Sequence, residues 1–285
     1  MVSLIDGKIP QIMAPGVADF SGKAVLVTGG TKGIGLATAL AFAERGAICW
    51  LTYLWGSADE SDVRREFAAR GACEPHLVQA DVSSSEDLEA LLQEIRSHHD
   101  RLEVFISNVA SAQTPNGLAD YSERGLLKSI EYSAWPLVSH TLAVRRLLGH
   151  YPQYVLGVSS LGIESRIPGY DFAAASKSVL EALCRYLAYR LKDEDVRVNV
   201  IRAGLVKTES AAATLGDDAI RFVEEVVGPD GFVAPEDVAN VAVALCSGLM
   251  DAVNGQILTV DRGQAFRDNM FRLFDRSVGQ APAPD

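Results

Sequence analysis

The chain has 285 residues, of which 48% are hydrophobic and 22% charged, and its formal net charge is -11. This length allows one large α/β core, so we expect a single domain with short tails. The acidic balance argues against a nucleic-acid partner, because binding to a phosphate backbone needs clustered Lys and Arg side chains, and it favours a small-molecule substrate.

The cysteines, the apolar stretches and the ends of the chain indicate a cytoplasmic protein without a membrane span. Residues 238–250 are the longest apolar stretch, shorter than the ~20 residues of a transmembrane helix, and predict a buried helix. Residues 1–20 lack a secretory pattern and predict an N-terminal arm, before one domain over 21–265 and a C-terminal tail over 266–285. The cysteines form no CxxC pair, so reduced thiols without zinc are expected at Cys49, Cys73, Cys184 and Cys246.

From Lys23 onward, apolar runs rich in β-branched residues alternate with stretches of helical periodicity. This alternation predicts an α/β domain with a seven-stranded parallel sheet and helices on both faces. The predicted strands are residues 24–28, 48–53, 74–80, 104–108, 154–159, 197–201 and 256–260. The predicted helices are residues 35–45, 61–70, 86–98, 124–148, 173–191 and 235–247, with a bend at Pro136.

A glycine-rich turn follows the first predicted strand and leads directly into a helix. Residues 28–35 read TGGTKGIG. Free N–H groups and the dipole at such a helix start attract a pyrophosphate if no side chain blocks its approach, and Gly29, Gly33 and Gly35 leave that space. The turn predicts a dinucleotide site; the alternative is a tight glycine turn without a ligand.

The TGxxxGxG spacing of this turn resembles the short-chain dehydrogenases/reductases and differs from the GxGxxG fingerprint. Three segments extend the resemblance over residues 23–263: residues 81–82 resemble the pair that contacts adenine, residues 107–110 the NNAG segment, and residues 199–208 a segment in which Ala203 replaces the usual Pro. For Asp81 alone, a helix cap is the alternative. The resemblance implies a Rossmann-type domain that binds a nicotinamide cofactor through Gly29, Thr31, Lys32, Gly33, Ile34, Gly35, Asp81, Val82, Asn108, Ala110, Lys177, Gly204, Val206 and Thr208.

The expected cofactor is NADPH/NADP. The second predicted strand ends near Tyr53 without the Asp or Glu that an NAD-specific enzyme places there for the ribose hydroxyls. Lys32 lies just before Gly33, where NADPH-preferring relatives often carry a basic residue, and a cation there can pair with the 2′-phosphate. The alternative for Lys32 is a solvated surface lysine.

The usual active site of this family combines a Ser, a later Tyr and a Lys in a YxxxK motif. Ser160 and Lys177 fit the spacing, but Ala173 stands where the Tyr is expected. Tyr170 instead forms a YxxxxxxK motif with Lys177, which resembles the divergent enoyl-thioester (enoyl-[acyl-carrier-protein]) reductases. The resemblance implies catalytic roles for Tyr170, Lys177 and Ser160, and an acyl thioester of coenzyme A or a carrier protein as substrate.

Hydride transfer to the β-carbon of an enoyl thioester creates an enolate, so a donor is needed at the carbonyl oxygen. By the resemblance this donor is Tyr170; Lys177 holds the nicotinamide ribose and lowers the tyrosine pKa, and Ser160 orients the substrate or Tyr170. Two alternatives stay open. One is a carbonyl reductase for a bulky polyketide-like substrate, with Tyr170 or the substrate supplying the proton; the other is a cofactor-binding protein without turnover.

Two further expectations concern a lid and assembly. Residues 209–231 resemble the variable segment that shapes the substrate pocket, and we expect them to form a mobile lid. The family usually pairs through its fourth and fifth helices, which implies a homotetramer or homodimer. The predicted contact includes an apolar series that exceeds the needs of the core: Leu180, Leu183, Leu187 and Leu191.

Overall fold

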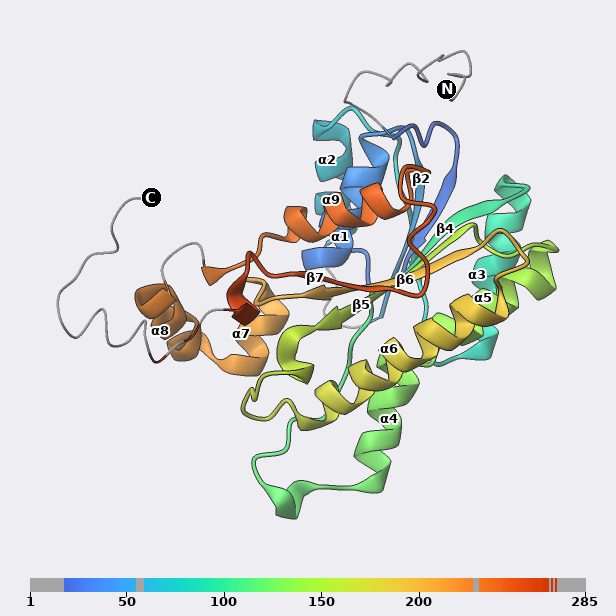
Figure 1. The fold of residues 1–285 in the computed structure, drawn as a ribbon. Helices are drawn as coiled ribbons and strands as arrows, with labels where there is room; N and C mark the ends of the chain where they lie inside the picture. The colour runs from blue at the N-terminus through green and yellow to red at the C-terminus, as the bar shows by residue number, and fades with distance from the viewer. Residues whose placement is uncertain (1–17, 55–58, 228–230, 267, 269, 271–285) are drawn as a thin grey trace, which may run out of the picture.

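The computed structural model describes residues 18–54, 59–227, 231–266, 268 and 270, so most of the predicted arm and tail lies outside the described residues. Its centre is one parallel sheet (Figure 1). The sheet has seven strands in the order β3-β2-β1-β4-β5-β6-β7. The predicted fold class is confirmed. The strands are β1 (Ala24–Val27), β2 (Ile48–Tyr53), β3 (His76–Gln79), β4 (Leu102–Ser107), β5 (Tyr154–Ser160), β6 (Arg197–Ala203) and β7 (Ile257–Val260).

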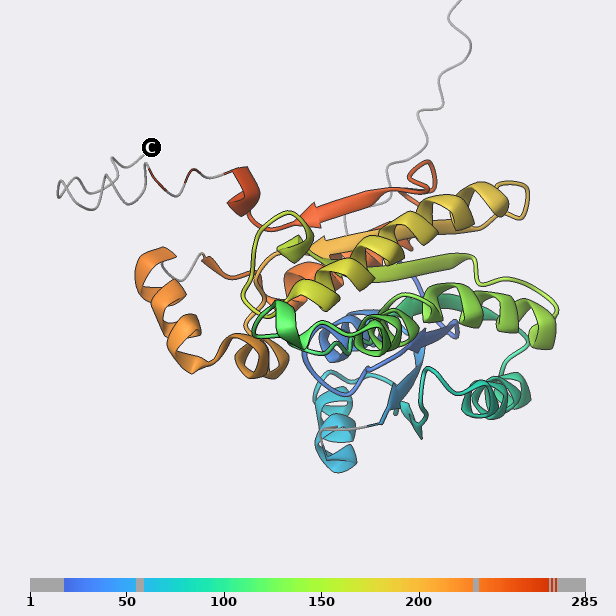
Figure 2. The ribbon, with the colours of Figure 1, turned by 90° about the horizontal axis from the view of Figure 1, so that it is seen from below.

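Helices cover both faces of the sheet (Figure 2). Val25 and Leu26 of β1 point to opposite faces, and each belongs to one of the two buried apolar clusters. Because both faces are covered, β1 is apolar and buried along its whole length. One layer holds α1 (Gly33–Ala43), α2 (Glu60–Ala69) and α9 (Pro235–Leu245), and the other holds α3 (Ser85–His98), α4 (Glu123–Ser133), α5 (Pro136–Leu148) and α6 (Asp171–Arg190).

Two helical regions differ from their predictions. The stretch predicted as one helix over residues 124–148 is divided into α4 and α5, because Pro136 has no N–H to donate and begins α5 instead. Residues 209–231 contain two helices that the sequence analysis did not predict, α7 (Glu209–Leu215) and α8 (Asp217–Val227), separated by Gly216 with a φ of 81°. The mobility of this segment stays a prediction.

The prediction that a leucine series on α6 contacts a second copy of the chain was wrong. Leu180, Leu187 and Leu191 are buried in the core of the chain itself, and Leu183 packs against the same cluster. The large side chains that α6 leaves exposed are aromatic, Tyr186 at 73% and Tyr189 at 64% exposure. Any contact with a second copy through this helix would therefore use its tyrosines.

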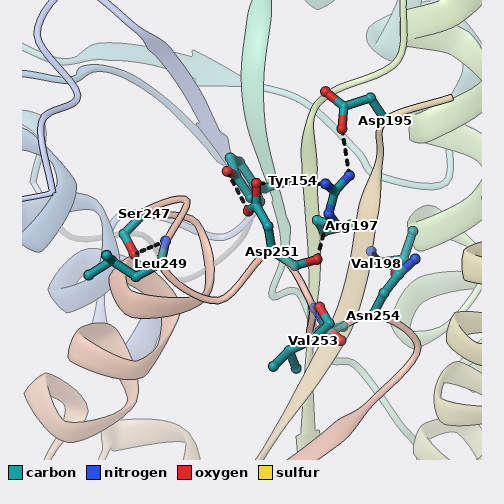
Figure 3. A network of polar contacts seen from close by, with 10 residues as sticks. Tyr154, Asp195, Arg197, Val198, Ser247, Leu249, Asp251, Val253 and Asn254 are labelled. Atoms are coloured by element: carbon teal, nitrogen blue, oxygen red, sulfur yellow. Dashed lines mark hydrogen bonds and ion pairs between the residues drawn. The ribbon is translucent and has the colours of Figure 1, made fainter. Parts of the chain in front are cut away.

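A network of polar contacts fixes the amino edge of the sheet, where β5 and β6 begin (Figure 3). The Tyr154 hydroxyl donates to an Asp251 carboxylate oxygen at 2.9 Å, and the Arg197 guanidinium donates to the Asp251 carbonyl oxygen at 2.8 Å. Asn254 accepts from the Val198 backbone N–H at 2.9 Å. These bonds hold the loop before β7 on the edge opposite the strand ends that carry the predicted site.

A buried histidine on α5 gives the fold a testable dependence on pH. The His140 ring stacks on Phe105 with 5.3 Å between ring centroids, and burial lowers its pKa from 6.5 to about 4. Below pH 6.5 His140 is protonated in the unfolded chain but stays neutral in the folded chain. The free energy of unfolding therefore decreases as the pH is lowered from 6.5 to about 4. We expect this residue alone to lower the free energy of unfolding by about 2 kcal/mol between pH 7.5 and pH 5.

The variant His140→Phe retains an aromatic ring and removes this titration. Urea unfolding at pH 7.5 and pH 5 should show a smaller loss of stability in the variant than in the wild-type protein. An equal loss in both proteins would contradict the assignment, because other groups would then account for the whole effect.

Candidate active site

A cavity of about 460 Å³ lies at the carboxyl ends of the strands. It spans the point where β1 and β4 lie side by side, the place where open α/β sheets bind ligands. Of the predicted site residues, Gly35 and Asp81 are not in its lining. The others meet in this one cavity: Gly29, Thr31, Lys32, Gly33, Ile34, Val82, Asn108, Ala110, Ser160, Tyr170, Lys177, Gly204, Val206 and Thr208.

The glycine turn leaves a cradle for a phosphate group at the start of α1. Gly29 and Gly33 have φ values of 62° and 55°, which favour glycine. A Cβ atom at Gly35 would lie 2.2 Å from the Gly29 carbonyl oxygen, so Gly35 allows close packing beneath the turn and does not face the cavity. Asn108 fixes the turn by donating from its side-chain amide to the carbonyl oxygens of Thr28 and Gly29 at 3.0 and 3.1 Å.

Asp81 lies beside the predicted adenine site and does not line the cavity. Its carboxylate accepts from the Ser83 backbone and hydroxyl at 2.8 and 2.7 Å, and from the Tyr132 hydroxyl at 2.9 Å. Burial alone would raise its pKa, but these hydrogen bonds outweigh burial and lower it. Ser84 caps α3, so the alternative of Asp81 as the cap was wrong. Val82, its neighbour, does line the cavity.

Lys32, the predicted partner of a 2′-phosphate, is not a free cation in this structure. Its ammonium lies 3.5 Å from the Glu209 carboxylate at the start of α7, and the two side chains are 38% and 84% exposed. An exposed pair of this kind contributes little to stability and is readily broken. A phosphate group at this place would compete with Glu209 for Lys32.

Tyr170 and Ser160 form a hydrogen-bonded pair in the cavity. Tyr170 precedes the first residue of α6, and Ser160 ends β5. Burial raises the pKa of Tyr170, while the hydrogen bond with Ser160 lowers it. The tyrosine ring packs on Gly162, where a Cβ atom would lie 2.5 Å from ring carbon Cε1. Gly162 was not predicted as a site residue, since its role depends on contact with a side chain eight positions later.

Lys177 lies two turns into α6 and is buried, with 4% of its surface exposed. Its Nζ donates to the Val158 carbonyl oxygen of β5 at 2.6 Å, and burial lowers its pKa to about 8. At neutral pH most of the molecules therefore carry a charged ammonium here. An ammonium has three donors, so two stay available for a ligand in the cavity.

Ala173 also lines the cavity, one helical turn after Tyr170. Its methyl group offers no proton, so the phenol at the start of α6 in this cavity is that of Tyr170. Tyr132 also lines the cavity, but its hydroxyl donates to Asp81. The cavity joins the phosphate cradle to Tyr170 and Lys177, and its residues fit a nicotinamide dinucleotide: the glycine turn for the pyrophosphate and Lys177 for the ribose.

Comparison with known proteins identifies the group to which these features belong. Residues 29–265 match the model of a family described as enoyl-(acyl carrier protein) reductase. The chain belongs to this family. It is a short-chain dehydrogenase/reductase close to the enoyl reductases, as the TGxxxGxG and YxxxxxxK spacings predicted.

Two curated enoyl-[acyl-carrier-protein] reductases [NADH], from Aquifex aeolicus and Escherichia coli, are each 29% identical to this family member. The alignments cover 85% of this chain and 91% and 94% of those proteins. The 3beta-hydroxysteroid dehydrogenase 1 of Eggerthella lenta is 32% identical over 86% of this chain and 94% of its own length. The chain is therefore an oxidoreductase of a family whose named members act on different substrates.

Solved structures of related oxidoreductases share the fold of this enoyl reductase family member. A 7α-hydroxysteroid dehydrogenase complexed with NADH and 7-oxo glycochenodeoxycholic acid is 24% identical, with a TM-score of 0.76, over 86% of this chain and 95% of that chain. An actinorhodin polyketide ketoreductase with NADPH is 22% identical, with a TM-score of 0.74, over 85% of this chain and 97% of that chain.

Within the described residues no helix is long and apolar enough to cross a membrane, and no group of His, Cys, Asp and Glu side chains is arranged for a metal ion.

Proposed function

We propose that this protein is an NADPH-dependent enoyl-thioester reductase that reduces the conjugated C=C bond of an acyl chain carried on coenzyme A or on a carrier protein. One observation carries the proposal: Tyr170, in YxxxxxxK spacing, lies in the cavity beside Ser160 and Lys177, while Ala173 lines the cavity where a YxxxK tyrosine would stand. The curated enoyl reductases at 29% identity support it.

In this proposal the bound nicotinamide supplies the hydride for the β-carbon of the substrate. Tyr170 donates a hydrogen bond to the thioester carbonyl oxygen, and this bond strengthens as negative charge develops there. Ser160 orients the Tyr170 hydroxyl. Lys177 holds the nicotinamide ribose, and its positive charge makes Tyr170 a stronger donor. The enolate then takes up a proton at its α-carbon, from Tyr170 or from water, which gives the saturated thioester. The apolar wall from Ile167 and Leu215 excludes water from the acyl chain.

One assay separates this function from its main alternative. Oxidation of NADPH is followed with crotonyl-CoA and longer enoyl thioesters, and in parallel with ketones and 3-ketoacyl thioesters. Turnover of enoyl thioesters is the expected result. Turnover confined to ketones would overturn the proposal, and cofactor binding without turnover on any of these compounds would indicate a non-catalytic protein.

A ketone reductase for a bulky, polyketide-like substrate is the second candidate. The observation that favours it is the Eggerthella lenta hydroxysteroid dehydrogenase, which at 32% is slightly more similar in sequence than the enoyl reductases named above. Tyr170 or a hydroxyl of the substrate would then supply the proton. Ala173 weighs against it, because the standard acid of ketone reduction is missing.

The preference for NADPH rests on Lys32 and on the lack of a carboxylate at the end of β2. Against it stand the [NADH] names of the curated relatives and the pairing of Lys32 with Glu209. We expect Lys32→Ala to lower the ratio of NADPH to NADH affinity by about fivefold, the scale of an exposed ion pair. Fluorescence titration with both cofactors measures the ratio.

The matched variant Glu209→Gln breaks the same ion pair from the other side. It frees Lys32 and is expected to move the cofactor ratio in the opposite direction, toward NADPH. A ratio that is unchanged in both variants would remove Lys32 from the cofactor site.

The proposal also includes a cytoplasmic homodimer or homotetramer. Its support is the set of large apolar and aromatic side chains left exposed on and beside the two helices that pair in this family: Trp135, Leu142, Tyr186 and Tyr189. The free cysteines, three of them buried, agree with a reducing compartment.

A further inference from the structure

A buried ion cluster lies directly behind the predicted catalytic residues, where α6, β5 and β6 meet. Arg202 of β6 is paired in the sheet with Ser159 of β5, the residue before Ser160. Glu181 lies one helical turn after Lys177 on α6 and is 5% exposed. The Ser159 hydroxyl donates to Glu181 Oε1 at 2.8 Å, so the cluster touches the strand that ends in Ser160.

Arg202 uses all three of its guanidinium nitrogens. Nε and Nη2 donate to the two carboxylate oxygens of Glu181 at 2.9 and 2.6 Å, the bidentate geometry that Arg forms and Lys cannot. Nη1 donates to the Glu164 carboxylate in the loop that joins β5 to α6. The Arg202 side chain is 12% exposed and that of Glu164 is 54% exposed.

The hydrogen bond from Arg202 to Glu164 joins the loop between β5 and α6 to strand β6. The loop runs from Ser160 to Tyr170, so both members of the hydroxyl pair lie at its ends. In the described part of the chain, the other hydrogen bonds of residues 161–169 stay within residues 160–170. The Arg202–Glu164 pair is therefore the one hydrogen bond that joins this stretch to another element among those residues.

The pair with Glu164 is not explained by stability. Glu181 alone satisfies the buried charge of Arg202, and an exposed carboxylate adds little to the free energy of folding. The pair does tie the middle of the loop to β6. The two ends of this loop carry the hydroxyl groups of Ser160 and Tyr170, whose relative position depends on the loop conformation.

We propose that Arg202 and Glu164 are positioning residues, which anchor the loop to the Glu181 cluster and so hold the Tyr170 hydroxyl in its place beside Ser160. Neither residue touches the reacting atoms. This inference rests on the proposed function for the role of Tyr170, but the anchoring of the loop is a separate property and can be measured without turnover.

The test is Glu164→Ala, which removes an exposed side chain and leaves the buried Arg202–Glu181 pair intact. Hydrogen exchange of backbone amides in residues 161–171, measured by mass spectrometry, is expected to become about tenfold faster, and kcat about tenfold lower, the scale of coupling between contacting residues. The KM for NADPH and the thermal midpoint are expected to stay near wild-type values. In an Arg202→Lys background, Glu164→Ala is expected to have no added effect on either rate.

Glu74→Ala is the matched control, because Glu74 is an exposed carboxylate paired with Arg64 at 2.5 Å away from the cavity. It should change neither exchange in residues 161–171 nor kcat.

Wild-type exchange in Glu164→Ala, or faster exchange with unchanged kcat, would overturn the proposal. If the wild-type protein reduces only ketones, the enoyl function fails, while exchange and kcat on the ketone still decide the role of Arg202. If it reduces no compound, the exchange result alone decides the anchoring, and the catalytic role of the anchor is overturned together with the function.

Discussion

Tyr170→Phe is expected to lower kcat on an enoyl thioester by about 100–1,000-fold, the cost of removing one oxyanion donor that acts mainly in the transition state. The change removes one oxygen and keeps the ring that packs on Gly162, so the cavity wall keeps its shape. The Kd for NADPH is expected to stay within about twofold, because the cofactor is assigned to the glycine turn and to Lys177. Steady-state kinetics and fluorescence titration measure the two quantities.

Tyr121→Phe is a suitable control for this variant. The Tyr121 hydroxyl donates to Asp171 at 2.7 Å, so it too lies beside the start of α6, but Tyr121 does not line the cavity. Its loss should leave kcat near the wild-type value. If Tyr170→Phe also keeps near wild-type turnover, the YxxxxxxK interpretation is wrong, and a proton from the substrate or from water becomes the leading account.

The fold was predictable because its main signals are local. Strands covered on both faces read as continuous apolar runs, and Val25 and Leu26 show both covered faces within two residues. The helices α7 and α8 were not predicted. They have 7 and 11 residues and are separated by Gly216, so the stretch has no long helical periodicity. The leucine series on α6 was misjudged because periodicity alone does not say whether an apolar face meets the core or a partner.

The candidate site was predictable where residues follow strand ends. Parallel strands bring their carboxyl ends to one edge, which is why the glycine turn, Asn108 and Ser160 share a cavity despite their separation in sequence. Side-chain partners across the fold were not predictable in this way. Glu209 beside Lys32 and Glu181 beside Arg202 depend on rotamers and on packing between elements, which no local pattern of one sequence encodes.

Lys177→Met is expected to impair both cofactor binding and turnover, in contrast to Tyr170→Phe. The lost ammonium is assigned to the nicotinamide ribose, and hydrogen bonds to charged groups contribute about 1.5–3 kcal/mol, which corresponds to a Kd raised by roughly 10–100-fold. The Val158 carbonyl oxygen also loses its donor. Met fills the space of the stem, and removal of a buried charge offsets part of that loss, so the variant is expected to fold.

The pH profile adds a second readout for Lys177. Burial lowers its pKa to about 8, so the ammonium is lost as the pH rises through that value, and kcat/KM of the wild-type protein is expected to fall on this limb. The limb should be absent from Lys177→Met. Lys192→Met is the control, because Lys192 follows α6 on the surface and pairs with Asp193. If Lys177→Met binds NADPH within about twofold of wild type, the ribose assignment is wrong, since a charged donor that held the ribose could not be removed without a measurable loss of affinity.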